Sequence, residues 1–291
     1  MAPRGDAPVS APPGRHAPPE RRRPWPASEL GMRAVSGVVL GLLVLAATLT
    51  GGWLFALIWL AAGLAVVGEW LAITRTGPHR LLLALAGLVL AGLVAGARLA
   101  YPVLPLLGLG LGGAILLALL ARPRAGRLWA PLSLGCAAVV ALVPVLLRDD
   151  PRIGLAGPLW LFGVVWTTDI AAYFTGRTLG GPKLWPAVSP KKTWSGFGGG
   201  LLGATLVGGA VAAGATHLGA AQSLPVGPAL LLSALGSVLS QGGDLAESAL
   251  KRAYGAKDSG RLIPGHGGVM DRLDGFFAAA LLAGLLLAAG F

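Results

Sequence analysis

One stretch of this chain, residues 248–274, gathers charged and polar side chains between long apolar runs. It reads SALKRAYGAKDSGRLIPGHGGVMDRLD, whereas most of the chain is leucine, alanine, glycine and valine. Carboxylates beside basic residues, without a set of histidines or cysteines, suit a hard cation such as Mg²⁺ bridged to phosphate groups. The stretch therefore predicts chemistry on phosphates.

The segment GGDLAESALKR, which runs into this stretch, predicts a polar stripe on one helix face. Asp244, Glu247, Ser248 and Lys251 stand at positions i, i+3, i+4 and i+7. Acidic residues inside membrane-length helices are costly and point to function by default. A buried structural ion pair is the alternative, but two acids and two bases within nine residues exceed what one pair needs.

The turn PGHGG at 264–268 offers consecutive small residues whose amides could face an anion. Taken alone, such a cluster is usually only a turn. It gains weight because Asp271 and Asp274 follow three residues apart at the start of the last predicted helix. His266 is a lone histidine, so we expect it to contact phosphate or shape the loop rather than bind metal.

A second polar cluster lies at 167–196, TTDIAAYFTGRTLGGPKLWPAVSPKKTWSG. Asp169, Tyr173 and Arg177 follow at intervals of four residues and so share one helix face. The following loop carries Ser189, Lys191 and Lys192. A loop that meets lipid headgroups would explain the lysines but not an acid within the span. Glu69, near the end of another apolar run, is expected to be structural or an accessory ligand.

The composition indicates that lipid is the solvent for most of the chain. Of 291 residues, 55% are hydrophobic and 12% charged, about half the charged fraction of soluble domains. The net charge of +11 would suggest nucleic acid in a soluble protein. Here the basic residues separate apolar runs, so we expect a topological role and no nucleic acid. The single cysteine, Cys136, excludes a disulfide framework.

The expected fold is an all-α polytopic membrane protein with about nine transmembrane helices. Runs long enough to cross a bilayer lie at 34–50, 53–73, 80–97, 101–121, 129–147, 153–176, 194–220, 223–250 and 273–291. With the N-terminus cytoplasmic, the inner segments hold 20 of the 23 Lys and Arg residues, and the outer ones hold Arg98, Arg148 and Arg152. This asymmetry supports the orientation and places the C-terminus outside.

The chain is expected to divide into two parts. Residues 1–33, rich in proline and arginine, are expected to be a disordered cytoplasmic tail. Residues 34–291 are expected to be the transmembrane catalytic domain, with its signature region at 244–275.

The stretch from Ser248 to Asp274 resembles the signature of the phosphatidate cytidylyltransferases, also called CDP-diacylglycerol synthases. The matching positions are Ser248, Lys251, Arg252, Lys257, Asp258, Gly260, Ile263, Pro264, His266, Gly267, Gly268, Asp271, Arg272 and Asp274. DIAAYFTGRTLGG and SPKKTWSG are similar to a second conserved region of that family. The resemblance implies transfer of CMP from CTP to phosphatidate, a multi-span fold, a metal centre and a homodimer; the N-terminal tail matches no family feature.

From the residues and this resemblance together we assign roles. The expected catalytic residues are Asp244, Lys251, Arg252, Asp271 and Arg272. The expected substrate-binding residues are Asp169, Ser189, Lys191, Lys192, Ser248, Lys257, His266, Gly267 and Gly268. The expected metal ligands are Asp244, Asp271, Asp258 and Asp274, for Mg²⁺, with a second, monovalent ion left open. Phosphatidate in the cytoplasmic leaflet should meet CTP at an active site that faces the cytoplasm, on a multi-pass protein of the inner (plasma) membrane.

Two other classes compete with this interpretation. A CTP-dependent lipid-alcohol kinase of the dolichol type also needs Mg²⁺, basic residues and many spans, but it would release CDP. An ion or anion transporter also places acids inside membrane helices, and the glycine-rich run at 196–214 fits a broken transporter helix. Close helix packing through small residues explains that run more simply.

Overall fold

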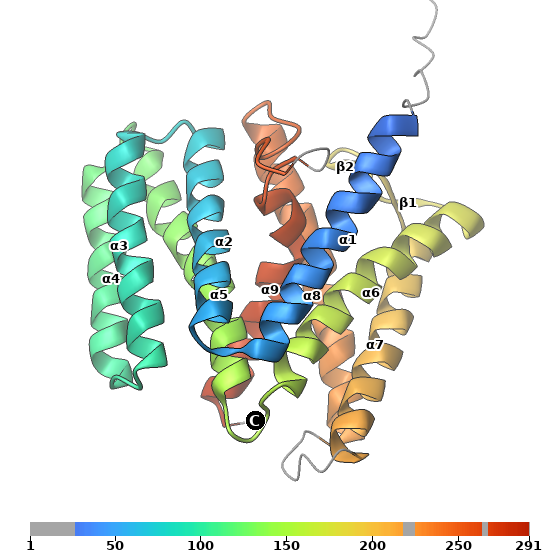
Figure 1. Cartoon of the computed structure of the whole chain (residues 1–291). Helices are drawn as coiled ribbons and strands as arrows, with labels where there is room; N and C mark the ends of the chain where they lie inside the picture. Colours follow the sequence, from blue (N-terminus) through green and yellow to red (C-terminus); the bar gives the residue numbers. More distant parts are fainter. Residues whose placement is uncertain (1–26, 218–224, 264–266, 291) are drawn as a thin grey trace, which may run out of the picture.

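The structure is a computed structural model that describes residues 27–217, 225–263 and 267–290. Its helices are α1 (Ala27–Thr50), α2 (Gly52–Ile73), α3 (His79–Arg98), α4 (Val103–Leu120), α5 (Gly126–Asp149), α6 (Ala156–Leu179), α7 (Trp194–His217), α8 (Val226–Ala253) and α9 (Met270–Ala288). Each of the nine predicted ranges falls on one of these helices, so the all-helical class is confirmed (Figure 1).

The first helix begins earlier than the sequence indicated. Residues 27–33 belong to α1, although they were assigned to a disordered tail that ended at residue 33. These seven residues contain no proline, so nothing in them opposes a helix. The rest of the predicted tail, residues 1–26, lies outside the described residues.

Six of these helices, α2, α3, α4, α5, α7 and α8, are long and apolar enough to cross a membrane. Large apolar side chains also face outward, among them Leu104, Leu107 and Leu111 on α4 and Val38 and Leu42 on α1. An exposed apolar belt of this size would aggregate in water, whereas in a bilayer it contacts lipid chains. The chain is therefore a multi-pass membrane protein.

An aromatic cluster joins the middle of α2, α6 and α9. The Trp59 ring stacks on Phe276, with centroids 4.9 Å apart, and on Phe162, with centroids 5.7 Å apart. All three side chains are buried. This contact ties the last helix to the N-terminal half of the chain and so helps to place the charged start of α9.

Helices α6 and α7 pack closely through small residues, and they lie side by side along their length (Figure 1). A Cβ at Gly200 would lie 2.8 Å from the Thr168 carbonyl oxygen, and one at Gly196 would lie 2.8 Å from the Ala172 carbonyl oxygen. Glycine therefore permits the backbones to approach, as in other membrane helix pairs. The glycine-rich run is a packing face of one continuous helix.

A β-hairpin that was not predicted follows α6. Helix α6 ends at Gly180, which adopts the left-handed φ of +61°, and strand β1 (Lys183–Trp185) then pairs antiparallel with β2 (Ser189–Thr193). The sequence had indicated only a basic loop. Its lysines and glycines gave no alternating apolar pattern from which strands could be predicted.

The two ends of the helix bundle differ in charge. At one end Arg98 forms an ion pair with Asp149, and the Arg148 Nε donates to the Thr48 carbonyl oxygen at 2.9 Å. On the connection between α5 and α6, at the same end, the Arg152 guanidinium holds the pKa of Asp150 below its ordinary value. The hairpin and the loop between α8 and α9 lie at the opposite end (Figure 1), so the bases predicted to be outside are separated from the predicted site.

Candidate active site

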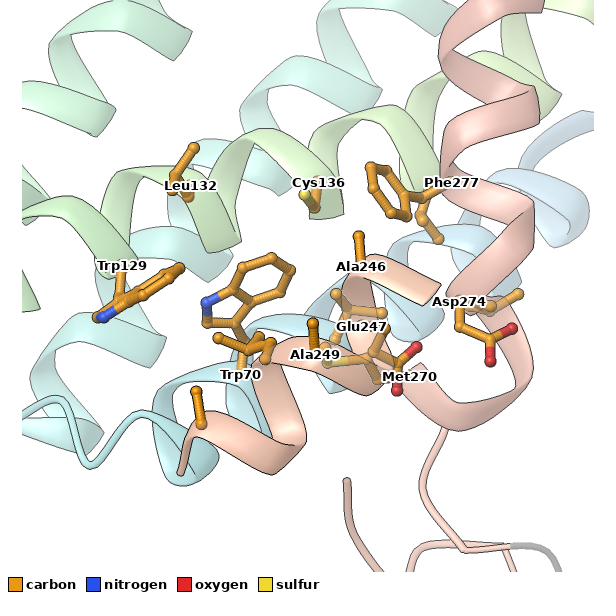
Figure 2. Close-up of a pocket in the computed structure, with 15 residues that line it drawn as sticks. Trp70, Trp129, Leu132, Cys136, Ala246, Glu247, Ala249, Met270, Asp274 and Phe277 are labelled. Carbon is orange, nitrogen blue, oxygen red and sulfur yellow. The ribbon is translucent and has the colours of Figure 1, made fainter. Parts of the chain in front are cut away.

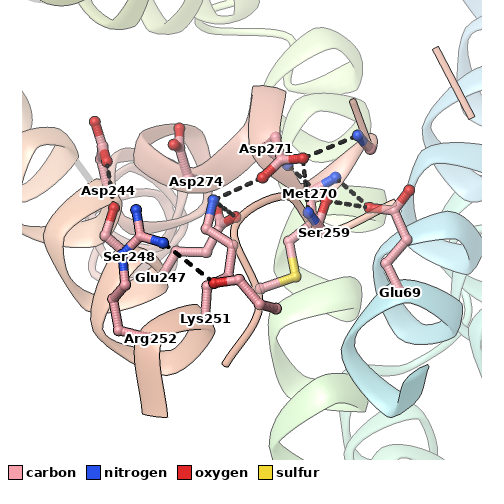
Figure 3. Close-up of polar contacts among 12 residues, drawn as sticks. Glu69, Asp244, Glu247, Ser248, Lys251, Arg252, Ser259, Met270, Asp271 and Asp274 are labelled. Carbon is pink, nitrogen blue, oxygen red and sulfur yellow. Dashed lines mark hydrogen bonds and ion pairs between the residues drawn. The ribbon is translucent and has the colours of Figure 1, made fainter. Parts of the chain in front are cut away.

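The two polar clusters found in the sequence meet at the end of the bundle where α8 finishes and α9 begins. Helix α8 supplies the predicted stripe of Asp244, Glu247, Ser248 and Lys251. Figure 3 shows Lys251 directed toward Asp271 at the start of α9, with Asp244 and Ser248 beside each other. The α8 C-terminus and the α9 N-terminus approach each other because α8 and α9 pack together as neighbours.

Asp244 pairs with a lysine from the hairpin. The Lys192 Nζ lies 2.5 Å from the Asp244 Oδ2, and both side chains are one quarter exposed. On the other oxygen, Oδ1, the carboxylate accepts a hydrogen bond of 3.3 Å from the Ser248 Oγ. The hairpin thus delivers a cation from β2 onto α8, in a position open enough for a soluble anion to reach.

Lys251 bridges two acids between α8 and α9. Its Nζ lies 2.9 Å from the Glu247 Oε1 and 2.6 Å from the Asp271 Oδ1. The Glu247 side chain is only 2% exposed and that of Lys251 11%, so this triad is buried. Two acids against one base leave a net negative charge, and a further cation or a proton would neutralise it.

The second oxygen of Asp271 holds the preceding loop. The Asp271 Oδ2 accepts hydrogen bonds from the Ser259 N–H at 2.8 Å and the Gly268 N–H at 2.9 Å. Both Asp271 oxygens therefore have partners within the protein, and the Gly268 amide faces a carboxylate. The assignments of Asp271 as a metal ligand and of Gly268 as a phosphate contact stay predictions; either role requires these bonds to be shared or exchanged.

Two further acids, Asp169 and Asp274, form the negative side of the site together with Asp244. The carboxylates of Asp169 and Asp274 are each repelled by that of Asp244, and they repel one another. Lys192 and Arg272, by contrast, attract the carboxylate of Asp169. One Asp274 oxygen accepts the Gly275 N–H at 2.7 Å. Asp169 and Asp244 come from the two separate sequence clusters, and the fold brings them together.

These carboxylates suit a hard cation that is completed by substrate. Among the described residues no three His, Cys, Asp or Glu side chains are arranged to hold a metal. Mg²⁺, however, is commonly bound by one or two carboxylates together with substrate phosphates and water. The Lys192 ammonium already lies against Asp244, so this position accepts a cation, and Asp244 with Asp274 or Asp169 fits the donor set.

Other predicted site residues lie around this centre. Lys191, Arg252, Lys257 and Asp258 are exposed, and Ser189 is half-buried on the hairpin. Gly267 adopts the left-handed φ of +84°, and its carbonyl oxygen accepts the Ile263 N–H at 2.9 Å. His266 lies outside the described residues. Asp258 is thus at the mouth of the site rather than within the cluster of acids.

An apolar cavity of about 420 Å³ adjoins the acids. Helices α2, α5, α8 and α9 line it, mainly with apolar side chains that include Trp70, Trp129 and Phe277. Figure 2 shows Cys136 deep on the α5 wall, with Glu247 and Asp274 on the opposite side. A molecule with a charged head and an apolar body could therefore contact the acids and this cavity at once.

Sequence reasoning identified the residue types of the site but missed two of its features. It did not predict that Lys251 forms ion pairs with both Glu247 and Asp271. The pair with Glu247 could have been predicted, because the two residues are four positions apart on one helix face. It also did not foresee that a hairpin positions Lys192. Nothing in the local pattern indicated the pairing of Lys192 with Asp244, because the two lie on separate elements.

Comparison with known proteins assigns this membrane-embedded site to a class. Residues 31–289 match the model of the cytidylyltransferase family, which is nearly the whole chain, and the chain belongs to that family. A family that transfers cytidylyl groups agrees with a site in which bases and acids from several helices converge.

Several relatives carry a more particular name. The phosphatidate cytidylyltransferase of Brucella suis biovar 1 (strain 1330) is 44% identical over 257 residues, which is 88% of this chain and 92% of that protein. The protein of the same name from Brucella melitensis biotype 1 gives the same values. That of Bacillus subtilis (strain 168) is 45% identical over 130 residues, which is 45% of this chain and 46% of that protein.

Proposed function

We propose that this protein is a phosphatidate cytidylyltransferase, which transfers CMP from CTP to phosphatidate and yields CDP-diacylglycerol and pyrophosphate. The observation that carries the proposal is the convergence of Asp169, Lys192, Asp244, Lys251 and Asp271 beside an apolar cavity, in a chain of the cytidylyltransferase family. Such a site can accept a lipid and a polyphosphate together.

The reaction asks for charge neutralisation more than for a general base. The attacking phosphatidate oxygen is already anionic at neutral pH, so the barrier comes from bringing two polyanions into line. Lys192 pairs with Asp244, and Lys192 and Arg272 both attract Asp169 electrostatically. We assign them, with Lys251, to the phosphates, and Arg252, Lys257 and Lys191 to attraction of the nucleotide at the mouth.

We assign Asp244 and Asp274 as the first choice of ligands for Mg²⁺, with Asp271, Asp258 and Asp169 close by as further candidates. When bound, Mg²⁺ would offset charge on the triphosphate and on the leaving pyrophosphate. In that state Lys192 would leave Asp244 and turn to a phosphate oxygen, since an ammonium and a metal ion repel each other at one carboxylate. A monovalent second ion remains a separate candidate.

The lipid is expected to enter from the membrane. The cavity lined by Trp70, Cys136 and Phe277 would receive part of an acyl chain, while the phosphate reaches the charged residues at the end of the bundle. Together with the basic inner segments, this supports a site on the cytoplasmic leaflet of the inner membrane. A homodimer is expected from the family resemblance.

The test is an assay of purified protein in detergent micelles that contain phosphatidate and CTP labelled in the cytosine. We expect labelled CDP-diacylglycerol together with pyrophosphate. Release of CDP with a phosphorylated lipid alcohol would instead indicate a lipid kinase. Flux across vesicles without a lipid product would indicate a transporter, and either result would overturn the proposal.

A further inference from the structure

Glu69 of α2 holds the loop between α8 and α9 from the other half of the bundle. Its Oε2 accepts hydrogen bonds from the Ser259 Oγ and the Met270 N–H, both at 2.8 Å, and its Oε1 accepts one from the Val269 N–H at 2.9 Å (Figure 3). Glu69, Ser259 and Met270 are each less than one tenth exposed. One buried carboxylate thus fastens Ser259, inside the loop, and the junction of the loop with α9.

These contacts give both oxygens of Glu69 donors from within the protein. Val269 precedes α9 and Met270 is its first residue, so the carboxylate meets two N–H groups that a helix start leaves without intrahelical partners. A negative charge at that position is also favoured by the helix dipole. Glu69 is therefore bound to the protein by both oxygens, which favours the structural alternative over the accessory ligand.

The hydrogen bonds of Glu69 are linked to the charged residues of the site through Ser259 and Asp271. The Ser259 Oγ accepts the Asp271 N–H at 3.2 Å, and the Ser259 N–H donates to the Asp271 Oδ2 at 2.8 Å. Asp271 in turn pairs with Lys251. A continuous chain of bonds therefore runs from α2 through the loop to α8, and the loop lies so close to Glu69 that a Cβ at Gly268 would collide with its carboxylate.

We propose that Glu69 is a positioning residue for the cytidylyl transfer: it fixes Ser259 and the start of α9, and through Ser259 it sets the place of Asp271 and Lys251 at the site. This inference rests on the proposed function for its kinetic consequence. Glu69 acts without touching substrate. Its loss should displace charged groups that bind the nucleotide and leave the packing of α2 in place.

Glu69→Gln tests the proposal because it keeps the shape but presents an amide nitrogen to groups that are all donors. We expect KM for CTP to rise about tenfold or more, since hydrogen bonds to a charged acceptor are lost. Ser259→Ala should shift KM in the same direction by less. The double variant should resemble Glu69→Gln alone, since both changes break one network.

A purely structural role would give a different result. A smaller folded fraction lowers kcat and leaves KM for CTP unchanged, so an unchanged KM in Glu69→Gln would overturn the proposal. Trp160→Phe is the matched control, because it removes a 2.8 Å bond to the Ser233 Oγ far from the loop. We expect it to leave KM unaltered.

Limited trypsin digestion provides a readout that needs no turnover. Lys257 and Arg261 are exposed on either side of the buried Ser259, so a released loop should be cut at these residues much faster in Glu69→Gln than in the native chain. Equal rates of digestion in the variant and the native chain would refute the proposal that Glu69 holds the loop. If the native protein fails to make CDP-diacylglycerol, the function is wrong, and the digestion still decides whether Glu69 holds the loop.

Discussion

Asp244 is an acid of the site with a partner on each carboxylate oxygen, and one quarter of its side chain is exposed. It has Lys192 on one oxygen and Ser248 on the other, and it interacts with Asp169 and Asp274. Its charge therefore acts on both of these acids, so the role of the site in catalysis can be tested at this position.

Asp244→Asn is expected to lower kcat at least about a hundredfold, because the neutral amide can neither balance Lys192 nor hold a cation against phosphate. The measurement is the rate of CDP-diacylglycerol formation at saturating substrates. Asp149→Asn, the same change in an ion pair at the opposite end, is the control and should remain active. Near-native turnover in Asp244→Asn would remove this residue from the site.

Lys251 is the residue on which the buried acids depend. Its replacement by methionine leaves Glu247 and Asp271 without their shared base. Removal of one partner from a buried ion pair typically costs about 3 kcal/mol, so we expect a clear fall in the melting temperature measured in detergent.

The companion variant separates charge from packing. Adding Glu247→Gln to Lys251→Met removes one unpaired acid and should recover part of the lost stability, although not the activity. If Lys251→Met and the native protein have the same melting temperature, the triad does not contribute to the stability of the folded state.

Among the helices, the contact of α6 with α7 is sensitive to side-chain size. Gly200 lies against the Thr168 carbonyl oxygen, one residue from Asp169, whereas a Cβ at Gly198 on the same helix would meet nothing within 4 Å. The separation of these two helices thus determines where Asp169 stands relative to α8.

Gly200→Ala is expected to destabilise the protein by about 1–3 kcal/mol, since a backbone oxygen cannot yield to the added methyl group. Gly198→Ala is the matched control and should be neutral or slightly stabilising, as alanine favours a helix over glycine. Thermal unfolding followed by circular dichroism compares the two. Equal melting temperatures would contradict the close packing of α6 on α7.

Across the whole molecule, the cavity between α2, α5, α8 and α9 connects the acids to the apolar interior. Cys136 is the single cysteine of the chain, and it lines this cavity. The native protein therefore carries its own reporter, and the route proposed for the lipid can be followed without engineered labels.

Phosphatidate is expected to slow the reaction of Cys136 with an apolar maleimide several-fold, because an acyl chain would occupy the cavity. CTP alone should have little effect, since the nucleotide binds among charged groups. Mass spectrometry of the labelled protein gives the rates, and Cys136→Ser defines the background. Labelling that is unaffected by phosphatidate would exclude this cavity as the lipid position.

The sequence by itself determined the membrane helices and the types of residue at the site. Apolar runs of bilayer length can satisfy their backbone groups in lipid only as helices, so the ranges from 34 to 291 could be predicted closely. The stripe of Asp244, Ser248 and Lys251 followed from the helical repeat, which is local.

Only the tertiary structure decided which of these groups meet. Glu69 binds residues 190 and 201 positions away, and Lys192 reaches Asp244 from a hairpin that had no sequence signal. Such contacts depend on how helices pack and where the chain turns back, and local periodicity does not encode either. The engagement of both Asp271 oxygens became visible for the same reason, since it depends on neighbours in space and not on the residue's own type.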